Sequence, residues 1–109
     1  MTGLEAFEAL DLRVGRILSA EPLAGARKPA YQLSIDLGAL GVKRSSAQIT
    51  DLYTPETLVG RLVVCAVNLG TRRIAGFTSE VLVLGAPDDA GRVVLLAVER
   101  DVPLGGKVY

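Results

Sequence analysis

Hydrophobic and polar positions alternate along most of this chain. Over residues 30–37, apolar side chains at Tyr31, Leu33, Ile35 and Leu37 alternate with polar ones at Gln32, Ser34 and Asp36. A two-residue period is typical of a strand with one buried face and one solvated face. Similar runs of strand-forming residues predict further strands at residues 12–20, 42–49, 61–69, 77–84 and 92–98.

Short helices interrupt this alternation. Apolar residues recur at helical spacing over residues 3–10, behind a capping box formed by Thr2 and Glu5, which predicts an amphipathic helix. We expect this helix to cover the barrel or a subunit interface. A second short helix is expected within residues 50–60, because Pro55 suits the first turn of a helix.

The order of these elements indicates the fold class. Three strands, a short helix and further strands with glycine-bearing bends follow the order of an all-β OB-fold, a five-stranded Greek-key barrel. The run 61–69 is apolar on both faces, which places its strand in the middle of the sheet. Gly15 suits the coil or bulge of a strand that serves two sides of a barrel. A sandwich of five or six strands has the same periodicity and remains the alternative.

The composition predicts a single domain with a subunit interface. A chain of 109 residues is one domain by length, and 50% of its residues are apolar. A small chain with this surplus commonly uses part of it to contact a second copy, so we expect a homodimer. We expect residues 1–11 and 99–109 to be extensions at its interface. No stretch resembles a leader or a membrane span, from which we expect a cytoplasmic protein that does not insert into membranes.

Several classes of chemistry lack the residues that they need. The chain has no histidine, the usual general base and metal ligand. Its single cysteine, Cys65, lies in an apolar run and can form neither an intrachain disulfide nor a thiolate cluster. Lys43 near Ser45 and Ser46 resembles a serine–lysine pair, but no oxyanion-stabilising device accompanies it. We therefore expect a non-catalytic protein without a metal or cofactor.

The charged residues balance overall but gather locally. Twelve basic and twelve acidic residues leave no net charge to attract nucleic acid at long range. Nine of the twelve basic residues are arginine, whose planar fork suits phosphate. The pair Arg72–Arg73 is predicted to lie in a turn bounded by Gly70 and Gly76, braced by the strand that follows. A mixed, solubilising surface is the alternative interpretation of any one such pair.

Motifs along nearly the whole chain resemble the tRNA-binding domain family. The motifs are DLRVGRI (11–17), KPAYQLSIDLG (28–38), RSSAQIT (44–50), YTPETLVGR (53–61), VVCAVNL (63–69) and NLGTRRIAGFTSEVLVLG (68–85). The amino-acid sequences of these motifs are most similar to those of the stand-alone CsaA type, rather than to those of modules appended to aminoacyl-tRNA synthetases. The resemblance implies an OB-fold homodimer that binds tRNA or similarly structured RNA and has a chaperone-like role in protein export.

Residues suited to RNA contacts occur within these motifs. Duplex RNA is recognised through its shape, phosphates and 2′-hydroxyls, which suits arginine forks and short polar groups. The predicted RNA-binding residues are Arg27, Lys28, Lys43, Arg44, Ser45, Ser46, Gln48, Asn68, Arg72, Arg73 and Ser79. For Asn68 a turn-forming role stays open, and for Ser79 a buried hydroxyl bonded to a neighbouring strand.

A second function class also fits the sequence. In this alternative the protein is a chaperone that binds unfolded or pre-export polypeptides in an apolar groove, with the export machinery as a further partner, and RNA binding is vestigial.

Two differences from the sequence motifs of the family affect the predicted RNA contacts. Gly70–Thr71 stands where the CsaA type tends to have prolines, which should loosen the arginine pair, and Val81–Leu82 replaces the glycine and methionine of the synthetase-appended members.

Overall fold

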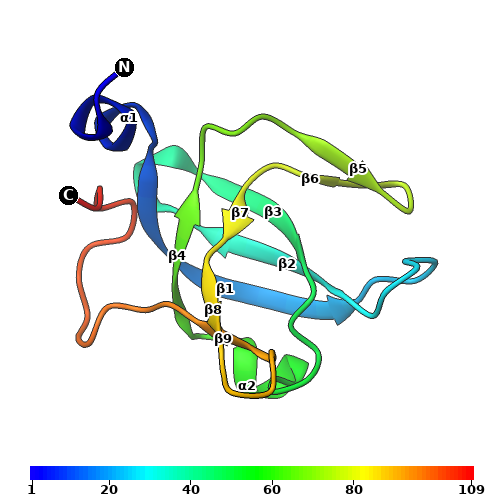
Figure 1. Ribbon diagram of the computed structural model, residues 1–109. Coiled ribbons are helices and arrows are strands. Elements are labelled where there is room, and N and C mark those ends of the chain that lie inside the picture. The colour runs from blue at the N-terminus through cyan, green and yellow to red at the C-terminus, as the bar shows by residue number, and fades with distance from the viewer.

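In the computed structural model, which describes residues 1–109, antiparallel strands curl into a barrel and both termini lie on one side of it (Figure 1). The helices are α1 (Gly3–Ala9), the 3-10 helix η1 (Gly38–Leu40) and α2 (Pro55–Leu58). The strands are β1 (Leu12–Pro22), β2 (Tyr31–Asp36), β3 (Val42–Ala47), β4 (Leu62–Ala66), β5 (Arg72–Ile74), β6 (Phe77–Ser79), β7 (Leu82–Val83), β8 (Gly85–Pro87) and β9 (Val93–Leu95). No helix is both long enough and apolar enough to cross a bilayer.

The main sheet has five strands in the order β3-β2-β1-β4-β7, and every neighbouring pair is antiparallel. The sheet curls until its outer strands meet. The backbone N–H groups of Glu80 and Val81 both donate to the carbonyl of Arg44, at 2.7 and 3.3 Å. These bonds join β3 to the segment before β7, so the predicted OB-type barrel is confirmed and a sandwich is not what forms.

The barrel interior is aliphatic, as the alternation predicts. Residues with 0–1% exposure include Ile17, Leu33, Ile35, Leu37, Leu58, Val63 and Cys65. Strand β4 lies between β1 and β7, which confirms its predicted central position. Burial raises the pKa of the Cys65 thiol to about 12, so this cysteine is a neutral part of the core.

Gly15 lies next to Arg16, where the partner of β1 changes from β4 to β2, but it does not form a bulge. The irregularity in the β1–β2 register lies between Ile17 and Ser19, so the bulge is not at the glycine. A Cβ at Gly15 would lie 2.6 Å from Cγ2 of Ile35 and 2.8 Å from Cδ2 of Leu37. Gly15 is therefore required because core side chains cross β1 closely at this point.

Both predicted α-helices are present, and the capping box predicted for the first is confirmed. Thr2 and Glu5 form the capping box of α1, and Thr54 caps α2, with Pro55 as its first residue. However, α1 contributes no buried residue, and Leu4 and Phe7 on it are 67% and 42% exposed. Of the two positions expected for α1, the one over the barrel is therefore wrong, and the one at a subunit interface stays a prediction, with the apolar face of α1 left open.

The arginine pair lies on a strand and not in the predicted turn. Arg72 and Arg73 are in β5, which pairs with β6 in a hairpin. The turn itself is Ala75–Gly76, with φ angles of +50° and +79°. Positive φ at both central residues is the geometry of a two-residue type I′ hairpin turn. The strand predicted at 77–84 is divided into β6 and β7, because the residues between them bond to β3.

The C-terminal segment packs along β1. The strand predicted at 92–98 is limited to β9, which pairs with β8. The tail then follows the edge of β1 that β2 leaves free. Gly105 N–H donates to the Val14 carbonyl at 2.7 Å, and Val108 N–H donates to the Leu12 carbonyl at 2.8 Å. The last residues of the chain therefore extend the barrel on the side where α1 lies.

Candidate nucleic-acid interface

An open cleft of about 440 Å³ lies at the end of the barrel opposite the termini. Three elements build it: the loop between β1 and β2, the end of β3, and the hairpin strand β5 (Figure 1). We call it the basic cleft and define it by the predicted site residues that line it: Arg27, Lys28, Ser46, Gln48, Arg72 and Arg73. The structure thus brings together six of the predicted residues from three separate segments of the chain.

The walls of the basic cleft meet at their tips. Gly25, at the turn of the β1–β2 loop, faces the hairpin turn, and a Cβ placed there would lie 3.6 Å from the Cβ of Ala75. The floor is provided by Ser46 and Gln48, at the end of β3 and just after it. Arg27 and Lys28 therefore approach from one wall, and Arg72 and Arg73 from the other.

The cations of the basic cleft have no acidic partners. The four salt bridges of the structure involve Arg13, Arg16, Arg92 and Arg100. None of them includes a side chain of the cleft, whose four cationic residues are all exposed. Unpaired charges around one concave surface create a local positive potential on a chain whose net charge is zero.

The other predicted cations lie outside the cleft. The guanidinium carbon of Arg44 is 4.1 Å from the centroid of the Phe77 ring, over a separate hollow on the outer face of the sheet. Lys43 is half-buried and borders neither cavity. Both residues are free of salt bridges. The basic track predicted from the sequence is therefore not continuous, since Arg44 lies over its own hollow and Lys43 borders neither cavity.

Two predicted serines use their hydroxyls within the protein. Ser45 is completely buried, and its hydroxyl donates to the backbone carbonyl of Ser46. Ser79 is 8% exposed; its Oγ accepts from the Ser46 N–H at 3.0 Å and donates to the Val81 carbonyl at 3.3 Å. Both hydroxyls are therefore engaged inside the protein, and the predicted contact of these serines with RNA stays a prediction. The alternative noted for Ser79, a buried hydroxyl bonded to a neighbouring strand, describes its geometry.

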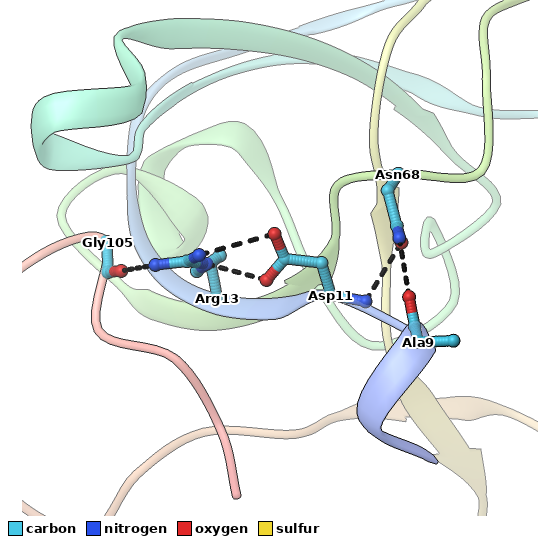
Figure 2. Close-up of polar contacts among 5 residues, drawn as sticks. All are labelled: Ala9, Asp11, Arg13, Asn68 and Gly105. Carbon is cyan, nitrogen blue, oxygen red and sulfur yellow. Dashed lines mark hydrogen bonds and ion pairs between the residues drawn. The ribbon is translucent and has the colours of Figure 1, made fainter. Parts of the chain in front are cut away.

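Asn68 also uses its polar groups within the protein. Its Oδ1 accepts from the Asp11 N–H at 2.9 Å and its Nδ2 donates to the Ala9 carbonyl at 2.8 Å (Figure 2). Asp11 in turn holds Arg13, which donates to the Gly105 carbonyl at 3.0 Å. Asn68 therefore fixes the junction between α1 and β1, and its predicted contact with RNA stays a prediction.

An apolar hollow of about 330 Å³ adjoins the basic cleft. Ser46, Gln48, Arg72 and Ile74 line both cavities, and the remaining lining is mainly aliphatic, with Ile49, Leu82, Val83 and Val93. Ile74 is half-buried and Leu82 is 49% exposed. Polar and apolar contacts are therefore available on one continuous surface.

Sequence analysis missed the polar residues of the hollow beneath Arg44. Glu21, Gln32 and Ser34 line it together with Arg44 and Phe77. The alternation of β2 had placed Gln32 and Ser34 on the solvated face, which was the available signal. The position of Phe77 was not predicted. No local sequence pattern indicates that Phe77 lies in the hairpin strand β6, apart from β7, with its ring under Arg44.

The family comparison covers most of the chain. Residues 12–107 match the model of the tRNA binding domain family. Among curated relatives, the methionine–tRNA ligase of Methanocaldococcus jannaschii is 40% identical over 102 residues, and that of Methanothrix thermoacetophila is 42% identical over 99 residues. These alignments cover 93% and 91% of this chain but only 15% and 14% of the ligases. The chain thus corresponds to a small part of those enzymes.

Solved structures match over the full chain. The chaperone CsaA of Bacillus anthracis is 50% identical with a TM-score of 0.93, and the alignment covers 100% of this chain and 99% of that one. The CsaA chaperone of Picrophilus torridus is 41% identical with a TM-score of 0.92 and full coverage of both chains. A MetRS-related protein of Pyrococcus horikoshii is 27% identical with a TM-score of 0.88, covering 100% of this chain and 98% of that chain.

Proposed function

Since the chain belongs to the tRNA-binding domain family, we propose that it is a non-catalytic protein that binds tRNA or similarly structured RNA, and that the basic cleft is the binding surface. The observation that carries this proposal is the grouping of Arg27, Lys28, Arg72 and Arg73 around one cleft without a single acidic partner. Cations kept free of carboxylates remain available for phosphates.

The cleft suits the RNA backbone better than it suits base edges. Arginine forks bind phosphate oxygens bidentately, and such charge-assisted bonds are the stronger class. Ser46 and Gln48 on the floor present short polar groups to a ribose 2′-hydroxyl. The cleft is open between the β1–β2 loop and the β5–β6 hairpin. The backbone of an RNA helix enters between these two segments while its bases stay paired in the helix. Recognition then depends on RNA shape and charge.

The test is the dependence of tRNA affinity on salt. Each phosphate neutralised by a cation adds about 0.7–0.9 to the slope of log affinity against log salt. The double variant Arg72→Ala/Arg73→Ala should therefore reduce this slope by about 1.4–1.8 and weaken binding at moderate salt by about 10- to 100-fold. Fluorescence anisotropy with labelled tRNA between 50 and roughly 300 mM salt measures both quantities.

A matched control removes the same charge elsewhere. Arg92 and Arg100 are paired with Asp88 and Glu99, so the variant Arg92→Ala/Arg100→Ala should leave the salt slope unchanged. If wild-type protein does not bind tRNA at low salt, or if both double variants lower the slope equally, the proposal is wrong.

We propose polypeptide binding as a second function, because an apolar hollow adjoins the basic cleft and similar proteins are the CsaA chaperones. Unfolded or pre-export chains would place apolar side chains between Ile49, Ile74 and Leu82. Their binding should change little with salt, in contrast to tRNA binding. Aggregation assays with an unfolding client test this. A Leu82→Ser variant that suppresses aggregation as well as wild type does would exclude the hollow.

We also propose that two copies associate through the side where the termini lie. Leu4 and Phe7 of α1 and Val102 and Tyr109 of the tail are exposed there, and an apolar hollow of about 360 Å³ lies beside Val14. Exposed apolar side chains gathered on one side of a small protein commonly mark a subunit interface. Light scattering should give the mass of a dimer, and a monomer at micromolar concentration would contradict the proposal.

A further inference from the structure

Next to the basic cleft, the outer face of the barrel carries a hollow of about 170 Å³ with a different lining. Two cross-strand rows of polar residues run along this face: Ser19, Ser34 and Arg44 in the first, and Glu21, Gln32 and Ser46 in the second. All of them except Ser46 line the hollow. Partners in such a row share one face of the sheet, with Cβ atoms about 5 Å apart. Gln32 borders this hollow and Ser46 borders the basic cleft, so the two cavities adjoin across one strand pair.

A flat cation forms one wall of the hollow. The guanidinium of Arg44 covers the Phe77 ring, with its central carbon 4.1 Å from the ring centroid. Phe77 is 5% exposed, whereas Arg44 is exposed and free of salt bridges. One face of the guanidinium is thus occupied by the ring and the other remains open. Unstacked RNA bases stack on such guanidinium planes.

A carboxylate lies at the edge of the same hollow. Glu21 accepts a hydrogen bond from Nε2 of Gln32 at 3.3 Å and has no cationic partner. An ionised carboxylate accepts hydrogen bonds only, so it repels phosphate and selects groups that donate. Among the four RNA bases, guanine presents two adjacent donors on its Watson–Crick edge, its ring N–H and its amino group. The amide of Gln32 adds a donor for the guanine carbonyl.

We propose that this hollow, which we call the stacking pocket, binds an unpaired guanine of an RNA whose neighbouring phosphates lie in the basic cleft. The base stacks on Arg44, and its Watson–Crick edge meets Glu21 and Gln32. The proposal rests on the proposed function for the phosphate contacts, and it adds one base contact to recognition by shape. Gln32 borders the stacking pocket and its cross-strand partner Ser46 borders the basic cleft, so one RNA segment can contact both.

RNA hairpins with one unpaired nucleotide test the pocket. Four hairpins have the same stem and differ only in a single bulged G, A, C or U, and their dissociation constants are measured at one fixed salt concentration. Wild-type protein should bind the G bulge about tenfold more tightly than the U bulge, as expected for one bidentate base contact. Equal affinity for the four hairpins would overturn the proposal.

Three variants separate the contacts. Glu21→Gln should reduce the G-over-U preference to less than about twofold, because the amide replaces an acceptor by a donor. Arg44→Lys keeps the charge and removes the plane, so it should weaken all four bulges by roughly fivefold or more. Arg72→Ala/Arg73→Ala should weaken all four and leave the preference for G intact. A preference for G that survives Glu21→Gln would overturn the assignment.

A failure of the proposed function gives a different result. If no hairpin binds at low salt, the basic cleft is not an RNA surface, and the pocket is then tested alone with guanosine monophosphate. Backbone amide resonances of Gln32 and Ser34 should shift with guanosine monophosphate and shift less with uridine monophosphate. Unchanged resonances with both nucleotides would overturn the stacking pocket.

Discussion

At the end of the barrel where the termini lie, Arg13 donates to the Asp11 carboxylate at 2.6 Å and to the Gly105 carbonyl at 3.0 Å (Figure 2). At the opposite end, Arg72 and Arg73 are exposed and have no ionic partner. Arg13 uses its hydrogen-bond donors within the protein and joins the tail to β1. Arg72 and Arg73 keep their donors free for a ligand.

This difference shows how one residue type serves two purposes in a chain without net charge. An arginine with a carboxylate and a carbonyl in reach stabilises the fold, and little of its charge remains for a ligand. An arginine without such partners contributes almost nothing to stability and retains its charge for an anion. We call the cluster of Asp11, Arg13 and Gly105 the paired end. Mutations at the paired end should change stability, whereas mutations in the basic cleft should change RNA affinity.

The largest expected effect is at the paired end. Arg13→Ala removes the bidentate bond to Asp11 and the bond to Gly105, and the Arg13 side chain is only 26% exposed. We expect a loss of about 2 kcal/mol in the free energy of unfolding, measured by urea denaturation, with tRNA affinity unchanged at a temperature where the variant is folded.

The control for Arg13→Ala is Arg100→Ala. Arg100 also has an acidic partner, Glu99, but the two side chains are 81% and 80% exposed. Exposed pairs contribute little, so this variant should lose less than about 0.5 kcal/mol. Equal losses in the two variants would mean that the cluster around Arg13 has no structural role.

A carboxylate placed in the basic cleft should make it resemble the paired end. In Gln48→Glu the new side chain lies on the floor between the two pairs of cations, where it competes with phosphate. We expect tRNA affinity to fall by about tenfold, or 1.4 kcal/mol, with stability within about 0.5 kcal/mol of wild type. Ala97→Glu adds the same charge at an exposed site away from the cleft. An equal fall in affinity with this control would point to net charge instead of the cleft.

The two amides offer a smaller, matched comparison. Asn68 makes two hydrogen bonds to backbone groups, whereas Gln48 makes none within the protein. Asn68→Ala should lower the free energy of unfolding by about 1 kcal/mol without affecting RNA binding. Gln48→Ala should leave stability unchanged and weaken tRNA binding about two- to threefold. The reverse pattern would place Asn68 at the RNA interface, as the sequence predicts.

The comparison also explains what sequence could and could not predict. The core strands follow from alternation, since Leu33, Ile35 and Leu37 are apolar at every second position and all are buried. The position of Arg72 in a hairpin strand was not predicted. The turn of this hairpin is Ala75–Gly76, both at positive φ, and it lacks the Asn-Gly or Gly-Gly sequence by which such turns are recognised. The roles of Ser79 and Asn68 depend on which distant backbone group each side chain meets. Such contacts are set by tertiary structure and leave no local pattern.

The smallest expected effect is the pH dependence of the paired end. The pKa of the Asp11 carboxyl lies below its usual value, because Arg13 donates a hydrogen bond to it and because Arg13 and Lys107 attract its negative charge. A lowered pKa in the folded state means that the unfolded state binds the proton more tightly. The stabilisation is therefore complete above the ordinary aspartate pKa near 4 and is lost as the pH falls through the lower folded value.

Asp11→Asn isolates this contribution. The free energy of unfolding of wild type and Asp11→Asn should differ most at neutral pH and converge as the pH falls below about 4, because the wild-type carboxyl then becomes neutral as well. The pKa of Asp88 is also lowered, by the backbone N–H groups of Arg92 and Ala90 and by the Arg92 side chain. Asp88 is present in both proteins, so its contribution to the pH dependence cancels in the difference between them. A gap between the two urea denaturation curves that stays constant from neutral pH into the acid range would show that Asp11 acts through its shape and hydrogen bonds alone. Its charge would then add no more to the paired end than the unpaired arginines add to the stability of the basic cleft.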